Sequence, residues 1–281
     1  MDFVGILKAV VIGLIEGITE WLPVSSSTHI DLVNHFLKAF EPGSAFYEIF
    51  EVVIQLGAIL AVILTYWSRL WPWASPAGEK RGRSWGLWLR ILVSAVPAAV
   101  IGFLIDDWRD AYLDGWWVRA AALIVYGVAF IVIERWRAGR LRAREVPEAE
   151  DIPVKTAGKI GLIQLLSLIP GTSRSGTTIL GGSLLGVSRK AAAEFSFFAA
   201  IPIMAGASGL KVLKAAVKGG LSFAAGEWAA LIIATLTAFA VSMLVVRALI
   251  GFLRSHSFEC FGWYRIALGI LVLLLAKGWI G

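Results

Sequence analysis

Two carboxylates lie one helical turn apart in an apolar stretch near the start of the chain. A helix would place Glu16 and Glu20 on one face, with their Cβ atoms about 6 Å apart. Two carboxylates this close in apolar surroundings cannot both be charged at low cost. Either one of them holds a proton in a helix contact, or a divalent cation such as Mg²⁺ or Ca²⁺ lies between them, because hard cations prefer carboxylate oxygens.

Hydroxyl side chains and a histidine follow directly. Pro23 ends the first helical arm, and the run Ser25–Thr28 leads to His29. Ser26 and His29 are three positions apart, so they share a face in the first turn of a second arm. This spacing suits a nucleophile and its base, although a histidine can also attack phosphorus itself. The alternative is that Ser26 only caps the helix and His29 is a hydrogen-bonded core residue.

A second cluster of small and hydroxyl residues surrounds Arg174 in the segment Pro170–Thr178. A helix is expected to begin within it, and the free N–H groups of a helix start bind anions. The arginine adds a planar fork of donors that suits phosphate. We therefore predict an anion-binding turn rather than a flexible turn with a snorkelling arginine. Its residues are Ser173, Arg174, Ser175, Gly176, Thr177 and Thr178.

The elements that position these clusters are apolar. The 281 residues are 58% hydrophobic and 16% charged, against about 45–50% and about 25% in soluble domains. Several charge-poor runs are long enough to cross a bilayer. We predict membrane-spanning helices at about 48–67, 87–105, 116–133, 193–213, 228–247 and 261–280. The fold class is thus an all-α integral membrane protein, with residues 1–281 in a single membrane domain.

The two clusters occupy equivalent places in an internal repeat. Leu22–Thr28 aligns with Ile169–Ser175, and each lies between two short apolar stretches that precede three full spans. A hairpin that enters and leaves on one side adds no crossing, so each half crosses the membrane three times and the halves are inverted. We predict repeats of about 3–134 and 158–281, each with one re-entrant helical hairpin and three transmembrane helices.

Lysine and arginine residues are concentrated in the loops at about 68–90 and 134–159. Because basic loops face the cytoplasm, both loops are predicted to be cytoplasmic and the first hairpin is predicted to open outward. The net charge of +6 therefore reflects topology, and nucleic-acid binding is not expected. Cys260 is the only cysteine, which excludes a disulfide within the chain.

Other polar residues fall inside the apolar spans. Glu48 and Glu194 open corresponding spans of the two halves, and a structural role at the repeat junction is expected for them. Arg265, near the start of the last span, is expected to pair with one of the buried carboxylates as part of the scaffold.

An inverted repeat brings the two hairpin turns together near the midplane of the membrane. The combined residues could hydrolyse a phosphoanhydride on a lipid. A cation on the two carboxylates would bridge the phosphates, Arg174 and nearby amides would stabilise charge, and Ser26, His29 or water would attack. The alternative is an inverted-repeat transporter or flippase for an anionic or polyprenyl-phosphate lipid, which would need no Ser–His pair.

The two clusters also resemble the signature motifs of a known family. Glu16–His29 and Pro170–Thr178 are similar to the motifs of the bacterial undecaprenyl-diphosphate phosphatase family of the bacitracin-resistance type, and the resemblance continues through Phe50–Gly57 and Ser188–Phe197. It implies a multi-pass enzyme of the bacterial cytoplasmic (inner) membrane that converts undecaprenyl diphosphate to undecaprenyl phosphate. Such an enzyme recycles the carrier lipid for cell-wall synthesis, confers bacitracin tolerance, needs a divalent cation and has an outward-facing site.

The resemblance also implies roles for single residues at matching motif positions. The acidic pair corresponds to Glu16 and Glu20, the catalytic Ser and His to Ser26 and His29, and the phosphate anchor to Arg174. Ser27 joins the 173–178 turn as an expected substrate-binding residue. The expected partners are a polyprenyl diphosphate and membrane lipids, and the sequence specifies no oligomeric state.

Overall fold

Six long apolar helices dominate the computed structural model, which describes residues 3–74, 79–138, 145–217 and 221–279. They are α3 (Ala45–Thr65), α5 (Glu79–Leu113), α6 (Trp116–Ala138), α9 (Arg189–Val217), α10 (Ala225–Phe252) and α11 (Glu259–Trp279). Each contains a stretch long and apolar enough to cross a membrane. The described residues contain no β-strand, only an isolated bridge between Val146 and Val187. The prediction of an all-α, multi-pass membrane protein is confirmed.

Several helices extend beyond the predicted apolar runs. The span predicted at 87–105 lies inside α5, which continues through Pro97 and ends only at Leu113. An apolar run marks the part that suits hydrocarbon, whereas the backbone hydrogen bonds of a helix can continue past the end of that run. The short helix α4 (Trp67–Leu70) and the 3₁₀ turn η1 (Ala149–Asp151) further shorten the predicted loops. Some predicted loop and span residues lie outside the described residues: Arg140, Arg142, Arg144 and Ile280.

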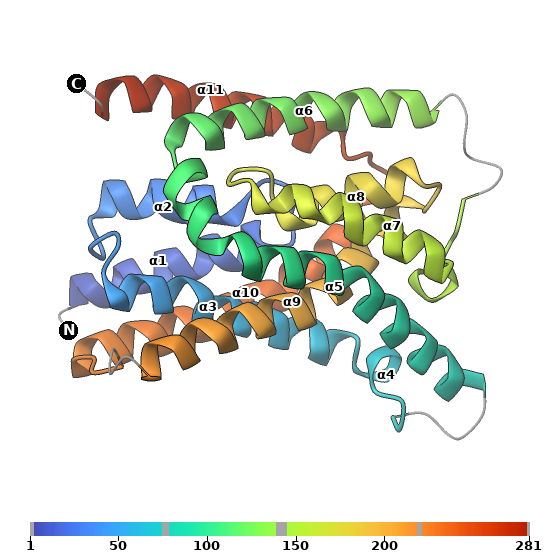
Figure 1. The fold of residues 1–281 in the computed structure, drawn as a ribbon, viewed down its shortest axis with the longest axis horizontal. Coiled ribbons are helices and arrows are strands. Elements are labelled where there is room, and N and C mark those ends of the chain that lie inside the picture. Colours follow the sequence, from blue (N-terminus) through green and yellow to red (C-terminus); the bar gives the residue numbers. More distant parts are fainter. Residues whose placement is uncertain (1–2, 75–78, 139–144, 218–220, 280–281) are drawn as a thin grey trace.

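Two hairpins of short helices fill the middle of the molecule. The first consists of α1 (Phe3–Thr19) and α2 (Ser26–Leu37), and the second of α7 (Val154–Gln164), the 3₁₀ turn η2 (Leu165–Leu168) and α8 (Arg174–Leu184). The first hairpin starts from the end of the molecule that carries both termini and the second from the opposite end, so their turns meet in the middle (Figure 1). The re-entrant placement of these hairpins in a bilayer stays a prediction.

The two halves of the chain are interlocked. In the first hairpin α1 packs on α10 of the second half, whereas α7 of the second hairpin packs on α5 of the first half. The α1–α10 contact is close because α1 presents glycines, and a Cβ added at Gly17 would lie 2.8 Å from the Ala238 carbonyl oxygen. The pairs α3–α9 and α6–α11 also join the halves. The predicted inversion and the repeat boundaries at 3–134 and 158–281 stay predictions.

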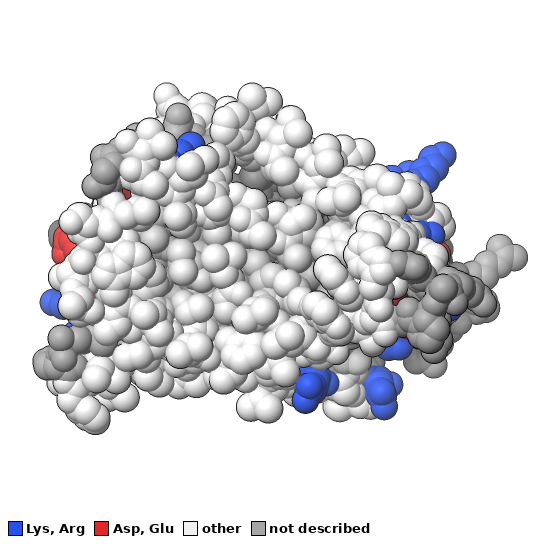
Figure 2. Space-filling model, turned by 90° about the horizontal axis from the view of Figure 1, so that it is seen from below, with Lys and Arg blue, Asp and Glu red and all other residues white. Residues whose placement is uncertain are grey.

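Charged side chains on the surface gather away from the middle of the molecule. The face shown in Figure 2 is uncharged across most of its width, and its visible charges lie toward its margins. At the end opposite the termini, Arg69 donates to both carboxylate oxygens of Glu150, each at 2.6 Å. Arg83 and Asp151 pair at 3.2 Å at the same end. The two basic loops therefore lie together, while their assignment to the cytoplasm stays a prediction.

Candidate active site

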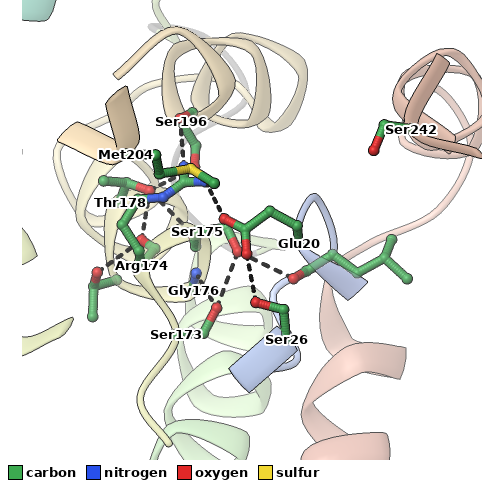
Figure 3. A network of polar contacts seen from close by, with 12 residues as sticks. Glu20, Ser26, Ser173, Arg174, Ser175, Gly176, Thr178, Ser196, Met204 and Ser242 are labelled. Atoms are coloured by element: carbon green, nitrogen blue, oxygen red, sulfur yellow. Dashed lines mark hydrogen bonds and ion pairs between the residues drawn. The ribbon is translucent and has the colours of Figure 1, made fainter. Parts of the chain in front are cut away.

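The two hairpin turns meet around Glu20. Its Oε1 accepts a hydrogen bond from Arg174 Nη2 at 2.7 Å, and its Oε2 accepts one from the Ser26 hydroxyl at 2.5 Å (Figure 3). The side chains of Glu20 and Arg174 are only 9% and 12% exposed. Charge-assisted hydrogen bonds of this length are strong in a setting that excludes most water. The structure thus joins a carboxylate, a hydroxyl and a guanidinium that come from two distant segments.

Residues of α9 hold the Arg174 side chain. Its Nη1 donates to the carbonyl oxygen of Ser196 at 2.7 Å and to the Ser196 hydroxyl at 3.2 Å, and its Nη2 lies 3.5 Å from the Met204 sulfur. The Trp21 ring centroid lies 6.0 Å from the guanidinium carbon. Arg174 is therefore a fixed donor that faces Glu20, and not a snorkelling side chain.

The start of α8 is built by its own hydroxyl groups. Ser173 caps the helix by accepting a hydrogen bond from the Gly176 amide at 3.1 Å. The hydroxyls of Thr177 and Thr178 both donate to the Arg174 carbonyl oxygen at 2.9 Å. These bonds use the amide of Gly176 and the two threonine hydroxyls to shape the turn. The donors left for a ligand at this helix start are the Arg174 side chain and the first amides of α8.

Both turns end on a serine with a positive backbone φ angle. Ser25 before α2 has φ 72°, and Ser173 before α8 has φ 71°. A side chain other than glycine adopts this conformation at some cost, and such strain clusters at functional sites. Ser26 is the first residue of α2 and not its cap, so the capping role considered for it is wrong. Ser27, the next residue, is exposed and can be reached by a ligand.

His29 faces α11 and not Ser26. Its Nδ1 donates to the Ser25 carbonyl oxygen at 2.7 Å, so its Nε2 accepts from the Tyr264 hydroxyl at 2.7 Å. The two rings stack with centroids 5.7 Å apart. Because the Ser26 hydroxyl bonds to Glu20, the Ser26–His29 contact expected from their spacing is not formed in this structure.

Glu16 lies one turn before Glu20 and is fully buried. Neither of its carboxylate oxygens has a hydrogen-bond partner among the described residues. Those residues also contain no group of three or more His, Cys, Asp or Glu side chains able to hold a metal. Mg²⁺, however, is commonly held by one or two carboxylates together with substrate phosphates. The unpartnered Glu16 carboxylate beside Glu20 fits such a shared site.

Residues 9–271, which include most of the first hairpin and the whole of the second, match the family described as bacitracin resistance protein BacA. The chain belongs to this family. It is 50% identical to the undecaprenyl-diphosphatase of Streptococcus mutans over 274 residues. This alignment covers 97% of the chain and 96% of the relative. It is 48% identical over 278 residues to that of Enterococcus faecalis, with 98% of each chain covered. For undecaprenyl-diphosphatase 1 of Oenococcus oeni the identity is 47% over 274 residues, with 97% of each covered.

In this BacA-family chain, Glu48, Glu194 and Arg265 match the structural roles expected for them only in part. Glu194 pairs with Arg69 at 2.9 Å, which agrees with a structural role, whereas Glu48 is exposed. The expected pairing of Arg265 with a carboxylate is wrong. Its two terminal nitrogens donate to main-chain carbonyl oxygens, those of Pro23, Gly171 and Thr172.

Sequence reasoning also missed three neighbours of the site. Ser196 and Met204 contact Arg174, and Tyr264 contacts His29. Ser196 is a polar residue between two phenylalanines of an apolar span, which is the one signal that could have singled it out. Tyr264 and Met204 carry no such signal, because aromatic residues and methionine are ordinary in membrane helices.

Proposed function

We propose that this BacA-family protein hydrolyses undecaprenyl diphosphate to undecaprenyl phosphate and phosphate in the bacterial cytoplasmic membrane. The observation that carries the proposal is the Glu20–Ser26–Arg174 contact between the hairpin turns. It combines a hydroxyl nucleophile, a carboxylate that accepts its proton and a guanidinium that donates hydrogen bonds to phosphate. Relatives 47–50% identical over nearly the whole chain are named undecaprenyl-diphosphatase. The activity recycles the carrier lipid for cell-wall synthesis and accounts for bacitracin tolerance.

The proposed reaction begins with proton transfer from the Ser26 hydroxyl to Glu20 Oε2. Ser26 Oγ attacks the terminal phosphorus, the bond from that phosphorus to the bridging oxygen breaks, and the prenyl phosphate leaves with the electron pair. Water then hydrolyses the phosphoserine and releases phosphate. Arg174 and the first amides of α8 hold the phosphoryl oxygens as their charge grows.

Substrate phosphates would share the Arg174 guanidinium with Glu20. In the structure Arg174 Nη2 donates to Glu20 Oε1, and the same planar fork of donors suits phosphate oxygens. His29, hydrogen-bonded to Ser25 and Tyr264, belongs to the proposed site as the residue that orients the start of α2.

A divalent cation, Mg²⁺ or Ca²⁺, is part of the proposal. Glu16 and Glu20 would hold it together with oxygens of the diphosphate, and the support for this is the buried, unpartnered carboxylate of Glu16. When bound, such an ion neutralises phosphate charge.

A lipid carrier without hydrolysis is the competing function. It would use Arg174 and the helix start for binding but would not require a hydroxyl hydrogen-bonded to a carboxylate. The Ser26–Glu20 contact therefore favours hydrolysis. We further propose that the site faces outward, on the side where the first hairpin opens.

The test is phosphate release by purified protein in detergent, given a C55 or shorter prenyl diphosphate with Mg²⁺ or Ca²⁺. We expect one phosphate per substrate, no release after a chelator, and a loss of at least about a thousandfold in Arg174→Ala and Glu20→Gln. A folded wild-type sample that releases no phosphate with either cation would contradict hydrolysis and favour the carrier.

A further inference from the structure

Arg265 of α11 is a buried cation that sits among main-chain oxygens. Its exposed fraction is 0%. A charge at this depth is costly unless its donors are satisfied. Nη1 donates to the Pro23 carbonyl oxygen at 2.9 Å, and Nη2 donates to those of Gly171 at 2.9 Å and Thr172 at 3.0 Å. The ring of Tyr126 lies 5.7 Å from the guanidinium carbon. The side chain is therefore held in one orientation.

The three carbonyl groups belong to different turns. Pro23 lies between α1 and α2, whereas Gly171 and Thr172 lie just before α8. A single side chain from a third element thus connects the turn that carries Ser26 with the turn that carries Arg174. Within the residues that the structure describes, two further side-chain bonds join the turn regions directly, the 2.7 Å bond from Arg174 to Glu20 and the 3.1 Å bond from the Ser175 hydroxyl to the Leu22 carbonyl oxygen.

The turn on the α8 side is tight where Arg265 binds it. Gly171 has φ +88°, and a Cβ there would lie 2.5 Å from the Arg119 carbonyl oxygen. This backbone points the carbonyl groups of Gly171 and Thr172 at one nitrogen of Arg265. The guanidinium fork is rigid and planar, so it can bridge oxygens on opposite sides, whereas a lysine ammonium is a point charge on a flexible stem.

We propose that Arg265 is a positioning residue for the reaction, which fixes the separation of the two hairpin turns and thereby sets Arg174 against Glu20 and Ser26. The inference rests on the proposed function. Arg265 reaches the reacting groups through the backbone of the turns. Because phosphoryl transfer depends on alignment, a displacement of about 1 Å between the turns can cost on the order of a hundredfold in rate.

The experiment compares Arg265→Lys and Arg265→Gln with a matched control, Arg137→Lys. Arg137 is also buried, at 3% exposed, and donates to the Ser183 hydroxyl at 2.7 Å, the Val187 carbonyl oxygen at 2.9 Å and the Glu145 carboxylate at 2.9 Å, away from the two turns. kcat, KM and the melting temperature are measured on purified protein. We expect both Arg265 variants to lose at least about tenfold in kcat per folded molecule with KM within about threefold. The control is expected to melt at a lower temperature with unchanged kcat.

A near-normal kcat in Arg265→Lys would overturn the proposal, because the charge alone would then suffice. Losses that only follow the folded fraction, as in the control, would also overturn it. A wild-type protein that releases no phosphate would instead overturn the proposed function.

Tyr126→Leu provides a second variant if the Arg265 variants do not fold. It removes the ring beside the guanidinium and leaves the three hydrogen bonds possible. We expect kcat to fall about two- to fivefold with little change in KM. An unchanged kcat in this variant would count against positioning by Arg265.

Discussion

At the scale of single residues, the hydrogen-bond partner of Ser26 decides where its proton goes. The hydroxyl lies 2.5 Å from Glu20 Oε2. His29, the base expected from spacing, uses Nδ1 on the Ser25 carbonyl and Nε2 on Tyr264. To accept a proton from Ser26, His29 would have to exchange its Tyr264 contact for a new one. The geometry favours Glu20 as the first proton acceptor.

Mutation of Ser26 and of His29 tests whether His29 takes part in the chemical step. We expect Ser26→Ala to lower kcat by at least about a hundredfold, because the nucleophile is lost. His29→Gln should cost only about three- to tenfold, the value of one or two hydrogen bonds that orient α2. Both are measured as steady-state kcat for phosphate release. A loss in His29→Gln as large as that in Ser26→Ala would instead identify His29 as the base or nucleophile.

The sequence predicted which residues gather at the site better than it predicted their contacts. Glu20, Ser26 and Arg174 were identified from rare polar residues in apolar runs, and the structure joins them. Helical spacing tells which side chains share a face, but it does not tell which neighbouring helix faces them. Tyr264 reaches His29 from the last helix, so no local pattern could have indicated that contact.

At the scale of elements, ion pairs tie the helix ends opposite the termini. Arg69, which follows α3, binds Glu150 through two bonds of 2.6 Å and Glu194 of α9 at 2.9 Å. Burial by itself would raise the pKa of Glu150, but the hydrogen bonds and charge of Arg69 lower it below its usual value. A carboxyl group with a lowered folded pKa stabilises the fold above its unfolded pKa of about 4.3. That stabilisation is lost as the pH falls through the folded pKa.

This linkage predicts that the difference in stability between the wild type and Glu150→Gln depends on pH. Near pH 7, Glu150→Gln should melt about 2–6 °C below the wild type, because one or two kcal/mol of ion-paired hydrogen bonding is removed. The difference should shrink as the pH falls below about 4.3 and disappear once the pH is below the lowered folded pKa of Glu150, where the wild type is protonated as well. Tryptophan fluorescence during heating in detergent measures it. Glu41→Gln, at an exposed position, is the control and should show little change at any pH. A constant difference at all pH values would contradict the ion-pair explanation.

The helices themselves were largely predictable, and their ends were not. All six spans were found from apolar runs, since the length of such a run is set by the membrane. The continuation of α5 to Leu113 depends on helix formation by polar residues beyond the apolar part. The 3₁₀ turn η2 precedes the tight turn at Gly171 and has no sequence signature of its own.

At the scale of the whole molecule, the two ends carry different loops. The turn between α2 and α3, with Glu41, lies at the end of the termini, and the turn between α10 and α11, with Ser255, lies at the other end. With Cys260→Ala as background, we expect Glu41→Cys to react with a membrane-impermeant maleimide on intact cells. Ser255→Cys should react only after lysis, because the basic end is predicted to face the cytoplasm. The reverse labelling pattern would invert the proposed orientation of the site.

The interlocked packing of the halves has a consequence for biosynthesis. The chain is made from its N-terminus, so the hairpin with Ser26 is complete long before α10, against which α1 packs, has been synthesised. Arg174 emerges next, and Arg265, which contacts both turns, comes only with the last helix. A nascent chain therefore holds its first hairpin undocked during most of its synthesis. The bonds that Tyr264 and Arg265 of α11 make with His29 and with the two turns are therefore the last contacts of the polar centre to form.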